Sequence, residues 1–205
     1  KLTALQQVEL LRVYAVTFTR LGQPDEASRE RLVAKFDPLF PAKTRELNAE
    51  LCELLAYLQS PSLAGKAPAL VALAPTQEEQ IEYIKALRGL RTGWTPELRE
   101  SYFKWFIKAG GYRGGASFAG FMKLIKQDAI GTLTEAEKAQ LKPVLDAQPV
   151  VQSPLQVMQQ GLAGHSFVKE WTVDELAPLA ERGLKNRDFE RGRQLFGGLG
   201  CFACH

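Results

Sequence analysis

The sequence holds few of the residues that bind metals or act as nucleophiles. Among its 205 residues are three cysteines, two histidines and two methionines. No acid and base pair, nucleophile triad or carboxylate cluster can be recognised, so we expect no enzyme active site in this chain. Two of the three cysteines, Cys201 and Cys204, lie among the last five residues, and the sequence given ends on His205. The residues that could bind a metal or act as nucleophiles are therefore concentrated at the C-terminal end of the sequence.

Long apolar runs and clusters of like charge are also missing. No stretch reaches the roughly 18 apolar residues of a membrane-spanning helix, so we expect no transmembrane segment here. The 26 lysines and arginines nearly balance 23 aspartates and glutamates, and their even spread argues against nucleic-acid binding. The first residues lack the pattern of a signal peptide. Because the chain starts on lysine and stops inside a motif, we expect it to be part of a longer protein. The lack of a signal-peptide pattern in this part therefore does not decide the compartment of the longer protein.

Helix start signals recur along the chain, whereas no alternating β-branched segment predicts a strand. In a capping box, a Thr hydroxyl and a Glu or Gln side chain bind the free amides of the first turn. Such boxes are predicted at Thr3 with Gln6, Thr76 with Glu79, Thr134 with Glu137, and Thr172 with Glu175. Simple caps are predicted at Asp25, Thr44, Asp188 and Thr95, the last followed by Pro96 at the first helical position.

Apolar residues behind these caps keep the spacing of one helix face. The stripe from Leu47 to Leu58 follows the i, i+4, i+7, i+8, i+11 pattern, and the stripe from Leu98 to Ala109 repeats it. We therefore predict an all-α fold with an array of antiparallel helices over residues 1–145. Thr44 and Thr76 each open a helix followed by a second apolar helix, which hints at HEAT-like hairpins. No residue-level repeat is evident, and an irregular helical bundle is the alternative.

The composition changes after Asp146. Prolines and glycines punctuate the next stretch, at Pro149, Pro154, Gly161 and Gly164. A connector with short helices is predicted over residues 146–185, with helices near Leu155–Gln160 and at Val173–Arg182. A last helix, Phe189–Phe196, leads into the cysteines, and residues 186–205 are expected to begin a further domain that is cut short.

The motif Cys201-Phe-Ala-Cys204-His205 is the main functional signal. Cys-x-x-Cys-His is the attachment pattern of c-type haem, in which both thiols add to vinyl groups and the histidine ligates the iron. Two alternatives stay open, half of a zinc site and a thiol redox pair. A zinc site needs a second ligand pair, and upstream there are only Cys52, expected to pack in a helix, and His165, expected in a loop.

The residues ahead of the motif resemble the N-terminal helix of class I cytochrome c. In DFERGRQLFGGLGCFACH, the family's acidic cap, glycine and aromatic correspond to Asp188, Gly192 and Phe196. The resemblance implies that Gly192 lets a C-terminal helix cross closely and that Phe196 packs in the crossing. It also implies a distal axial ligand, usually methionine, which is not in this chain. Met122 and Met158 precede the motif and are expected to be core or connector residues.

Longer segments resemble large bacterial proteins described as membrane-bound dehydrogenase-like. The resemblance covers about residues 40–205 and rests on WTPELRESYFKWF, GGASFAGFMKLIKQDAIGTLTEAEKAQL and the segment from FVKEW to the terminal motif. It implies a HEAT-like scaffold joined to a cytochrome c domain. It further implies a periplasmic or otherwise extracytoplasmic, membrane-associated parent, with a redox partner protein or an attached dehydrogenase domain.

Two functions are therefore carried forward. The first is electron transfer through a haem held by Cys201, Cys204 and His205, with His205 as the iron ligand. The second is a helical-repeat interaction scaffold whose terminal motif binds zinc or acts as a thiol site. The glycine run from Gly110 to Gly115 lacks the phosphate-loop pattern and is interpreted as a helix end and turn before a cap at Ser117. The aromatic cluster of Tyr102, Phe103, Trp105 and Phe106 is expected to be core.

Overall fold

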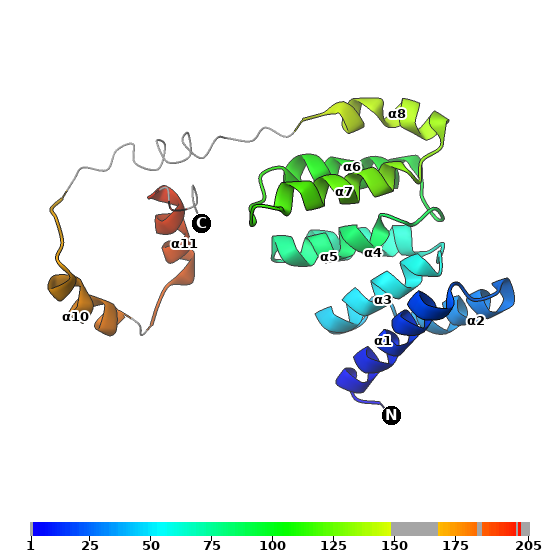
Figure 1. Ribbon diagram of the computed structural model, residues 1–205, viewed down its shortest axis with the longest axis horizontal. Helices are drawn as coiled ribbons and strands as arrows, with labels where there is room; N and C mark the ends of the chain where they lie inside the picture. Colours follow the sequence, from blue (N-terminus) through cyan, green and yellow to red (C-terminus); the bar gives the residue numbers. More distant parts are fainter. Residues whose placement is uncertain (1, 149–167, 184–185, 200, 202–205) are drawn as a thin grey trace. The chain divides into compact units, whose positions relative to one another are not determined.

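The computed structural model describes residues 2–148, 168–183, 186–199 and 201, and these residues form helices and connecting segments without any strand. The predicted all-α class is confirmed. The chain divides into two compact units, Lys1–Val150 and Val151–His205. The first contains α1 (Ala4–Leu21), α2 (Glu26–Phe36), the short 3-10 helix η1 (Asp37–Leu39), α3 (Arg45–Tyr57), α4 (Leu63–Leu73), α5 (Gln77–Leu87), α6 (Pro96–Ala109), α7 (Phe118–Ile130) and α8 (Glu135–Asp146) (Figure 1).

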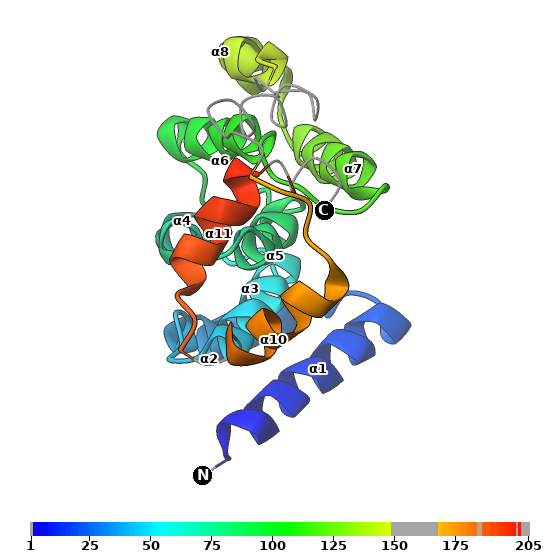
Figure 2. The same ribbon diagram turned by 90° about the vertical axis from the view of Figure 1, so that its left-hand side faces the viewer.

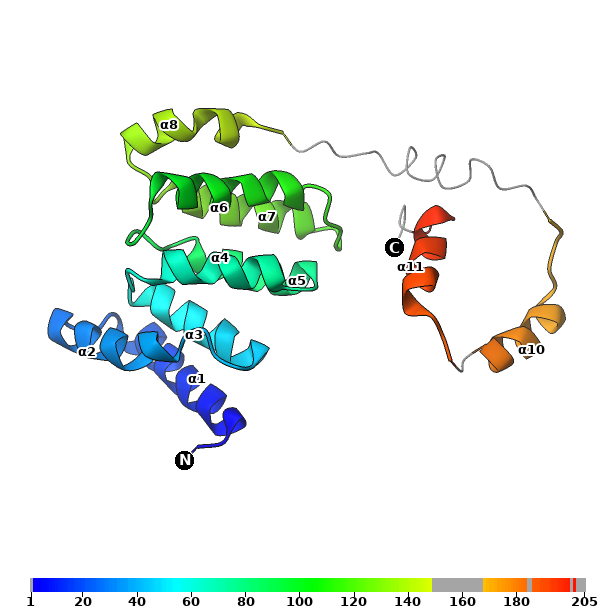
Figure 3. The same cartoon turned by 180° about the vertical axis from the view of Figure 1, so that it is seen from behind.

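Alternate helices of the first unit belong to two layers. Helices α1, α3, α5 and α7 contact one another in that order, and α4, α6 and α8 do the same in the second layer. Helix α2 packs on α3, and α4 packs on both α3 and α5. Figure 3 shows α1 and α2 at one end of the stack and α8 at the other. This is the predicted array of antiparallel helices.

Most of the predicted caps form. Thr3 and Thr134 make complete capping boxes, and Asp25, Thr44, Thr95 and Asp188 each accept a bond from a first-turn amide. At Thr76 only the threonine half forms, because the Glu79 carboxylate lies 3.8 Å from Nε of Arg45 instead. The predicted cap at Ser117 is wrong, because the Ser117 backbone is already helical and its side chain makes no capping bond.

A 32-residue repeat, which sequence analysis did not find, relates the hairpins α3–α4 and α5–α6. Six pairs of positions in and beside the first helix of each hairpin, 32 residues apart, hold the same or a similar residue: Ala42 with Ala74, Thr44 with Thr76, Glu46 with Glu78, Asn48 with Gln80, Leu55 with Leu87, and Leu58 with Leu90. Both Asn48 and Gln80 are buried and reach back to the preceding loop. Nδ2 of Asn48 donates to the Ala42 carbonyl at 3.1 Å, and Nε2 of Gln80 donates to the Ala74 carbonyl at 3.2 Å. The predicted hairpin repeat therefore extends to side-chain bonding.

The loops that end α3 and α5 are bonded to each other. Gln59 adopts a left-handed backbone conformation with φ of 56°. Its side-chain Nε2 donates to the Gly89 carbonyl at 3.0 Å, and its Oε1 accepts from the Arg91 backbone amide at 2.8 Å. Gly93 has φ of 75°, and a Cβ built there would lie 1.8 Å from the Pro61 carbonyl oxygen. Only glycine fits so close an approach of two backbones. These contacts fix the spacing between successive hairpins.

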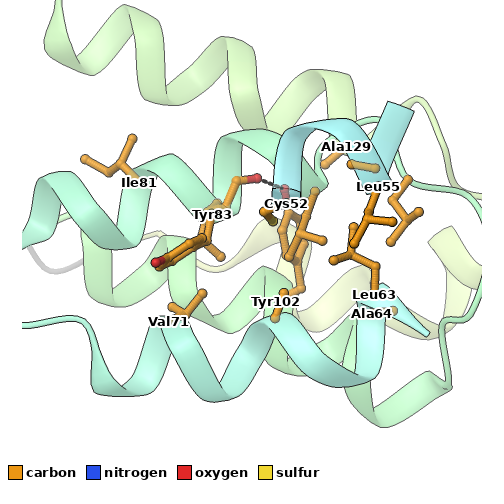
Figure 4. Packing of buried hydrophobic residues seen from close by; sticks show 14 of the residues in the cluster. Cys52, Leu55, Leu63, Ala64, Val71, Ile81, Tyr83, Tyr102 and Ala129 are labelled. Atoms are coloured by element: carbon orange, nitrogen blue, oxygen red, sulfur yellow. Dashed lines mark hydrogen bonds between the residues drawn. The ribbon is translucent and has the colours of Figure 1, made fainter. Parts of the chain in front are cut away.

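The core of the first unit lies between the two layers (Figure 4). Leu55, Leu63 and Phe103 are completely buried there, and Tyr102 packs edge-to-face against both Phe103 and Phe106. The hydroxyl of Tyr102 donates to the Ile84 carbonyl at 3.0 Å, which satisfies its one polar group. The prediction that Tyr102, Phe103, Trp105 and Phe106 form core is confirmed.

The second unit contains α10 (Val173–Gly183) and α11 (Phe189–Gly198). Both were predicted, and they run one and two residues further than expected. The capping box of Thr172 and Glu175 is present, with the Thr172 amide 3.0 Å from the Glu175 carboxylate. The helix expected near Leu155–Gln160 and the connector residues 149–167 lie outside the described residues. Among the residues described, no helix has the length and apolar character to span a membrane.

Candidate functional site

The candidate site begins with a capped helix. Asp188 ends the preceding segment in an extended conformation, and its carboxylate accepts from the Arg191 amide at 3.0 Å. This bond satisfies one of the free amides of the first turn, and the negative charge is favourable at the helix N-terminus. Helix α11 then runs to Gly198 and directs the chain into the cysteine motif.

One face of α11 is apolar and open to solvent. Phe189, Gly192, Phe196 and Leu199 recur at helical spacing, and no residue of the helix is buried. Phe189 is 87% exposed, and Leu195 beside this face is 51% exposed. A Cβ built at Gly192 meets no atom within 4 Å, so the described residues provide no close crossing at this glycine. The face has the features that a crossing helix would need, without that helix among the described residues.

Cys201 lies three residues beyond the last residue of this helix. It is a free thiol of intermediate exposure and takes a 3-10 conformation. Cys204 and His205 lie outside the described residues, so the convergence of the three predicted ligands stays a prediction. Their chemistry suits covalent haem attachment, because two thiols three positions apart can each form a thioether and the adjacent imidazole can ligate iron.

The remaining cysteine belongs to the core. Cys52 on α3 is completely buried, and burial raises the pKa of its thiol to about 12. The thiolate is the form that binds metals and attacks electrophiles, so this thiol is inert at neutral pH. The prediction that Cys52 packs in the helix is confirmed.

The other residues considered from the sequence contribute no ligand set. Met122 lies on α7 and packs partly buried against the core, as predicted, whereas Met158 and His165 lie outside the described residues. Gly110 ends α6, so the glycine run does form a helix end and turn. Among the described residues, no group of three or more His, Cys, Asp or Glu side chains could hold a metal ion.

A buried cation was not predicted from the sequence. Arg99 on α6 is 3% exposed, lies 4.5 Å from the Trp94 ring centre, and donates from Nη1 to the Thr132 hydroxyl at 3.1 Å. Its Nε has no hydrogen-bond partner in the part of the chain that the structure describes and lies 3.6 Å from the Glu137 carboxylate. Burial lowers the Arg99 pKa, while Glu137 opposes that shift. The only sequence signal was Trp94 five positions earlier, which is not specific. This cluster joins α6 to the start of α8.

Comparison of the chain with protein-family models, with curated proteins and with solved structures found no significant match.

Proposed function

We propose that Cys201, Cys204 and His205 attach a c-type haem and that the chain is part of an electron-transfer protein. The observation that carries the proposal is the Cys-x-x-Cys-His motif placed directly after the capped helix α11. Neither the motif nor the helix before it is sufficient by itself, because a cysteine pair at this spacing also suits zinc or thiol chemistry.

The described part of the site is compatible with such a group. Cys201 is free and not buried, so its thiol is accessible for addition to a vinyl group. The open side of α11 at Gly192 leaves room for another element to approach closely. Gly192 also carries a cost of about 1 kcal/mol relative to alanine inside a helix, which a packing role at this position would explain.

The roles of the three residues follow from their chemistry. Each cysteine S–H adds across one vinyl group and forms a thioether, so the group is held covalently. The imidazole of His205 supplies the proximal nitrogen. When bound, the haem supplies a one-electron iron couple whose potential depends on the second axial ligand and on burial. Met122 is an unsuitable second ligand because it packs against the core of the first unit.

The proposal extends to the context of the site. The helical array of the first unit would act as a scaffold that connects the haem to an attached dehydrogenase domain or a redox partner protein. Attachment to a Cys-x-x-Cys-His motif would take place outside the cytoplasm, so we expect a periplasmic or otherwise extracytoplasmic location and a membrane-associated parent.

The test is haem staining after denaturing electrophoresis, together with a pyridine haemochrome spectrum, on the full-length gene product exported in a host with cytochrome c maturation. We expect haem that stays on the denatured chain and is lost when Cys201 and Cys204 are both replaced by alanine. Cys52→Ala is the matched control, because its buried thiol should not affect attachment. A folded protein that contains zinc or no metal would refute the proposal and favour an interaction scaffold.

A further inference from the structure

Helix α1 has two apolar faces on opposite sides. Val8 and Leu11 are buried where α1 packs on α3. At helical spacing, the opposite face carries Leu5, Glu9, Val13, Val16 and Arg20, which we call the outer stripe. Figure 2 shows α1 at the end of the helical stack, where no further helix of the first unit covers this side.

The outer stripe is too apolar for a solvated end of an array. Leu5, Val13 and Val16 are 67%, 61% and 59% exposed. Terminal units of helical arrays usually carry a polar outer face, because nothing stacks on them. The surface between these side chains is shallowly hollowed and is lined by Glu9, Arg12, Val13, Val16 and Thr17. An apolar stripe with polar ends indicates a protein contact.

The charges on the stripe indicate which partner fits. Arg12 is bound to Glu50 of α3 at 2.7 Å, whereas Glu9 and Arg20 form no salt bridge with another described residue. Glu9 lies four residues before Val13, and Arg20 lies four residues after Val16. The stripe therefore has an acid, two valines and a base whose spacing reads the same in both directions, and this order is complementary to itself when reversed.

We propose that two copies of this chain associate through their α1 outer stripes, with the two helices antiparallel. In this register Val13 packs against Val16 of the second copy, and Glu9 faces Arg20 of the second copy at both ends. Such a two-fold contact uses the same surface on each copy and closes as a dimer. Because a single pair of helices is a small interface, the dimer is weak, with a dissociation constant in the micromolar range.

Charge reversal tests the register directly. Sedimentation velocity over a micromolar concentration series would compare the unmodified chain with Glu9→Arg, Arg20→Glu and the double variant. Each single change places like charges at both ends of the contact and should raise the dissociation constant about tenfold or more. The double variant restores opposite charges and should return the dissociation constant to that of the unmodified chain. Lys123→Glu, at an exposed position of α7, changes the net charge as Arg20→Glu does and should have no effect.

Three results would overturn the proposal. A chain that stays monomeric at every concentration has no such dimer, as would occur if a helix from elsewhere in the polypeptide packed on α1. A dimer that is unchanged by the single charge reversals uses another surface. Oligomers that grow beyond a dimer as the concentration rises, with a double variant that does not recover the affinity of the unmodified chain, would indicate head-to-tail stacking instead. Unchanged thermal melting of the four variants confirms that the exposed substitutions leave the fold intact.

Discussion

The buried Arg99 gives a sharp test of what holds the last helices of the array together. The perturbation is Glu137→Gln, which removes the one carboxylate that pairs with this cation among the described residues and keeps the side-chain shape. Glu137 also belongs to the capping box of α8, where its carboxylate accepts from the Thr134 amide at 2.8 Å. Because glutamine also serves in capping boxes, the substitution keeps the cap and removes the charge.

The size of the effect follows from burial. Removing one partner of a fully buried ion pair costs about 3–5 kcal/mol, whereas exposed pairs contribute about 1 kcal/mol or less. The Arg99 side chain is 4% exposed, but Glu137 is 34% exposed, and the atoms are 3.6 Å apart. We therefore expect a loss of about 1–2 kcal/mol, between these limits. For a unit of this size, the melting temperature would fall by about 2–8 °C.

The matched control is Glu135→Gln in the same first turn of α8. Glu135 is 89% exposed and pairs with Lys138, so its loss removes the same charge from the helix N-terminus without affecting Arg99. The assay is urea unfolding followed by circular dichroism, for both variants and for the unmodified chain. Equal losses for the two variants, within about 0.5 kcal/mol, would refute the reasoning. In an Arg99→Met background, Glu137→Gln should have little effect.

The pH dependence of this contribution has a definite sign. The Glu137 pKa lies below its usual value, chiefly because its carboxylate accepts from the Thr134 amide and hydroxyl, with a smaller effect from Arg99. A lowered folded-state pKa means that the stabilisation is present above the unfolded-state pKa of about 4.3 and is lost as pH falls through the folded-state value. The difference in stability between Glu137→Gln and the unmodified chain should therefore be full at neutral pH and shrink in acid.

Two further substitutions at glycine test the fold and the candidate site. Gly93→Ala should lower the free energy of unfolding by more than about 1 kcal/mol, because the new Cβ meets the Pro61 carbonyl and the backbone is left-handed; unchanged urea unfolding would contradict this. Gly192→Ala should raise the helicity and stability of α11 by about 1 kcal/mol in this chain, because the Cβ meets nothing within 4 Å. In the full-length gene product the same change should instead be destabilising, as melting of the haem-containing domain would report, if a helix crosses at Gly192.

The helices could be predicted well because their signals are local. Thr44, Thr95 and Asp188 cap the helices that their positions predict, since a capping side chain bonds only to its own first turn. Ser117 failed because a serine before an apolar run is also compatible with a helical backbone. The hairpins were predicted but their 32-residue spacing was not, because the identical pairs, such as Leu55 and Leu87, are of types common in any helix, and the distinctive pair Asn48 and Gln80 is alike in hydrogen bonding and burial rather than in residue identity.

The long-range polar contacts could not be predicted. Arg99 is separated by more than thirty residues from both Thr132 and Glu137, and nothing local marks a buried arginine on a helix whose neighbours are charged. The left-handed Gln59 is similar, because its conformation is stabilised by bonds to Gly89 and Arg91 in the next hairpin. At the candidate site the cap at Asp188 and the helix behind it could be predicted, while the arrangement of Cys201, Cys204 and His205 stays a prediction.

The exposure of α11 bears on the order in which a haem-containing domain would form. A helix of ten residues with no buried side chain has little stability of its own, since nucleation is unfavourable and packing normally supplies the stabilisation. A cofactor held only by a pocket would then have to wait for complete folding. Thioether bonds from Cys201 and Cys204 do not need that pocket, so under the proposed function attachment would come first, while the thiols are accessible. Closure against the apolar face of α11 would follow. Haem attached to a Phe196→Ala variant whose domain fails to close would support this order, because that substitution removes packing and leaves the attachment chemistry intact.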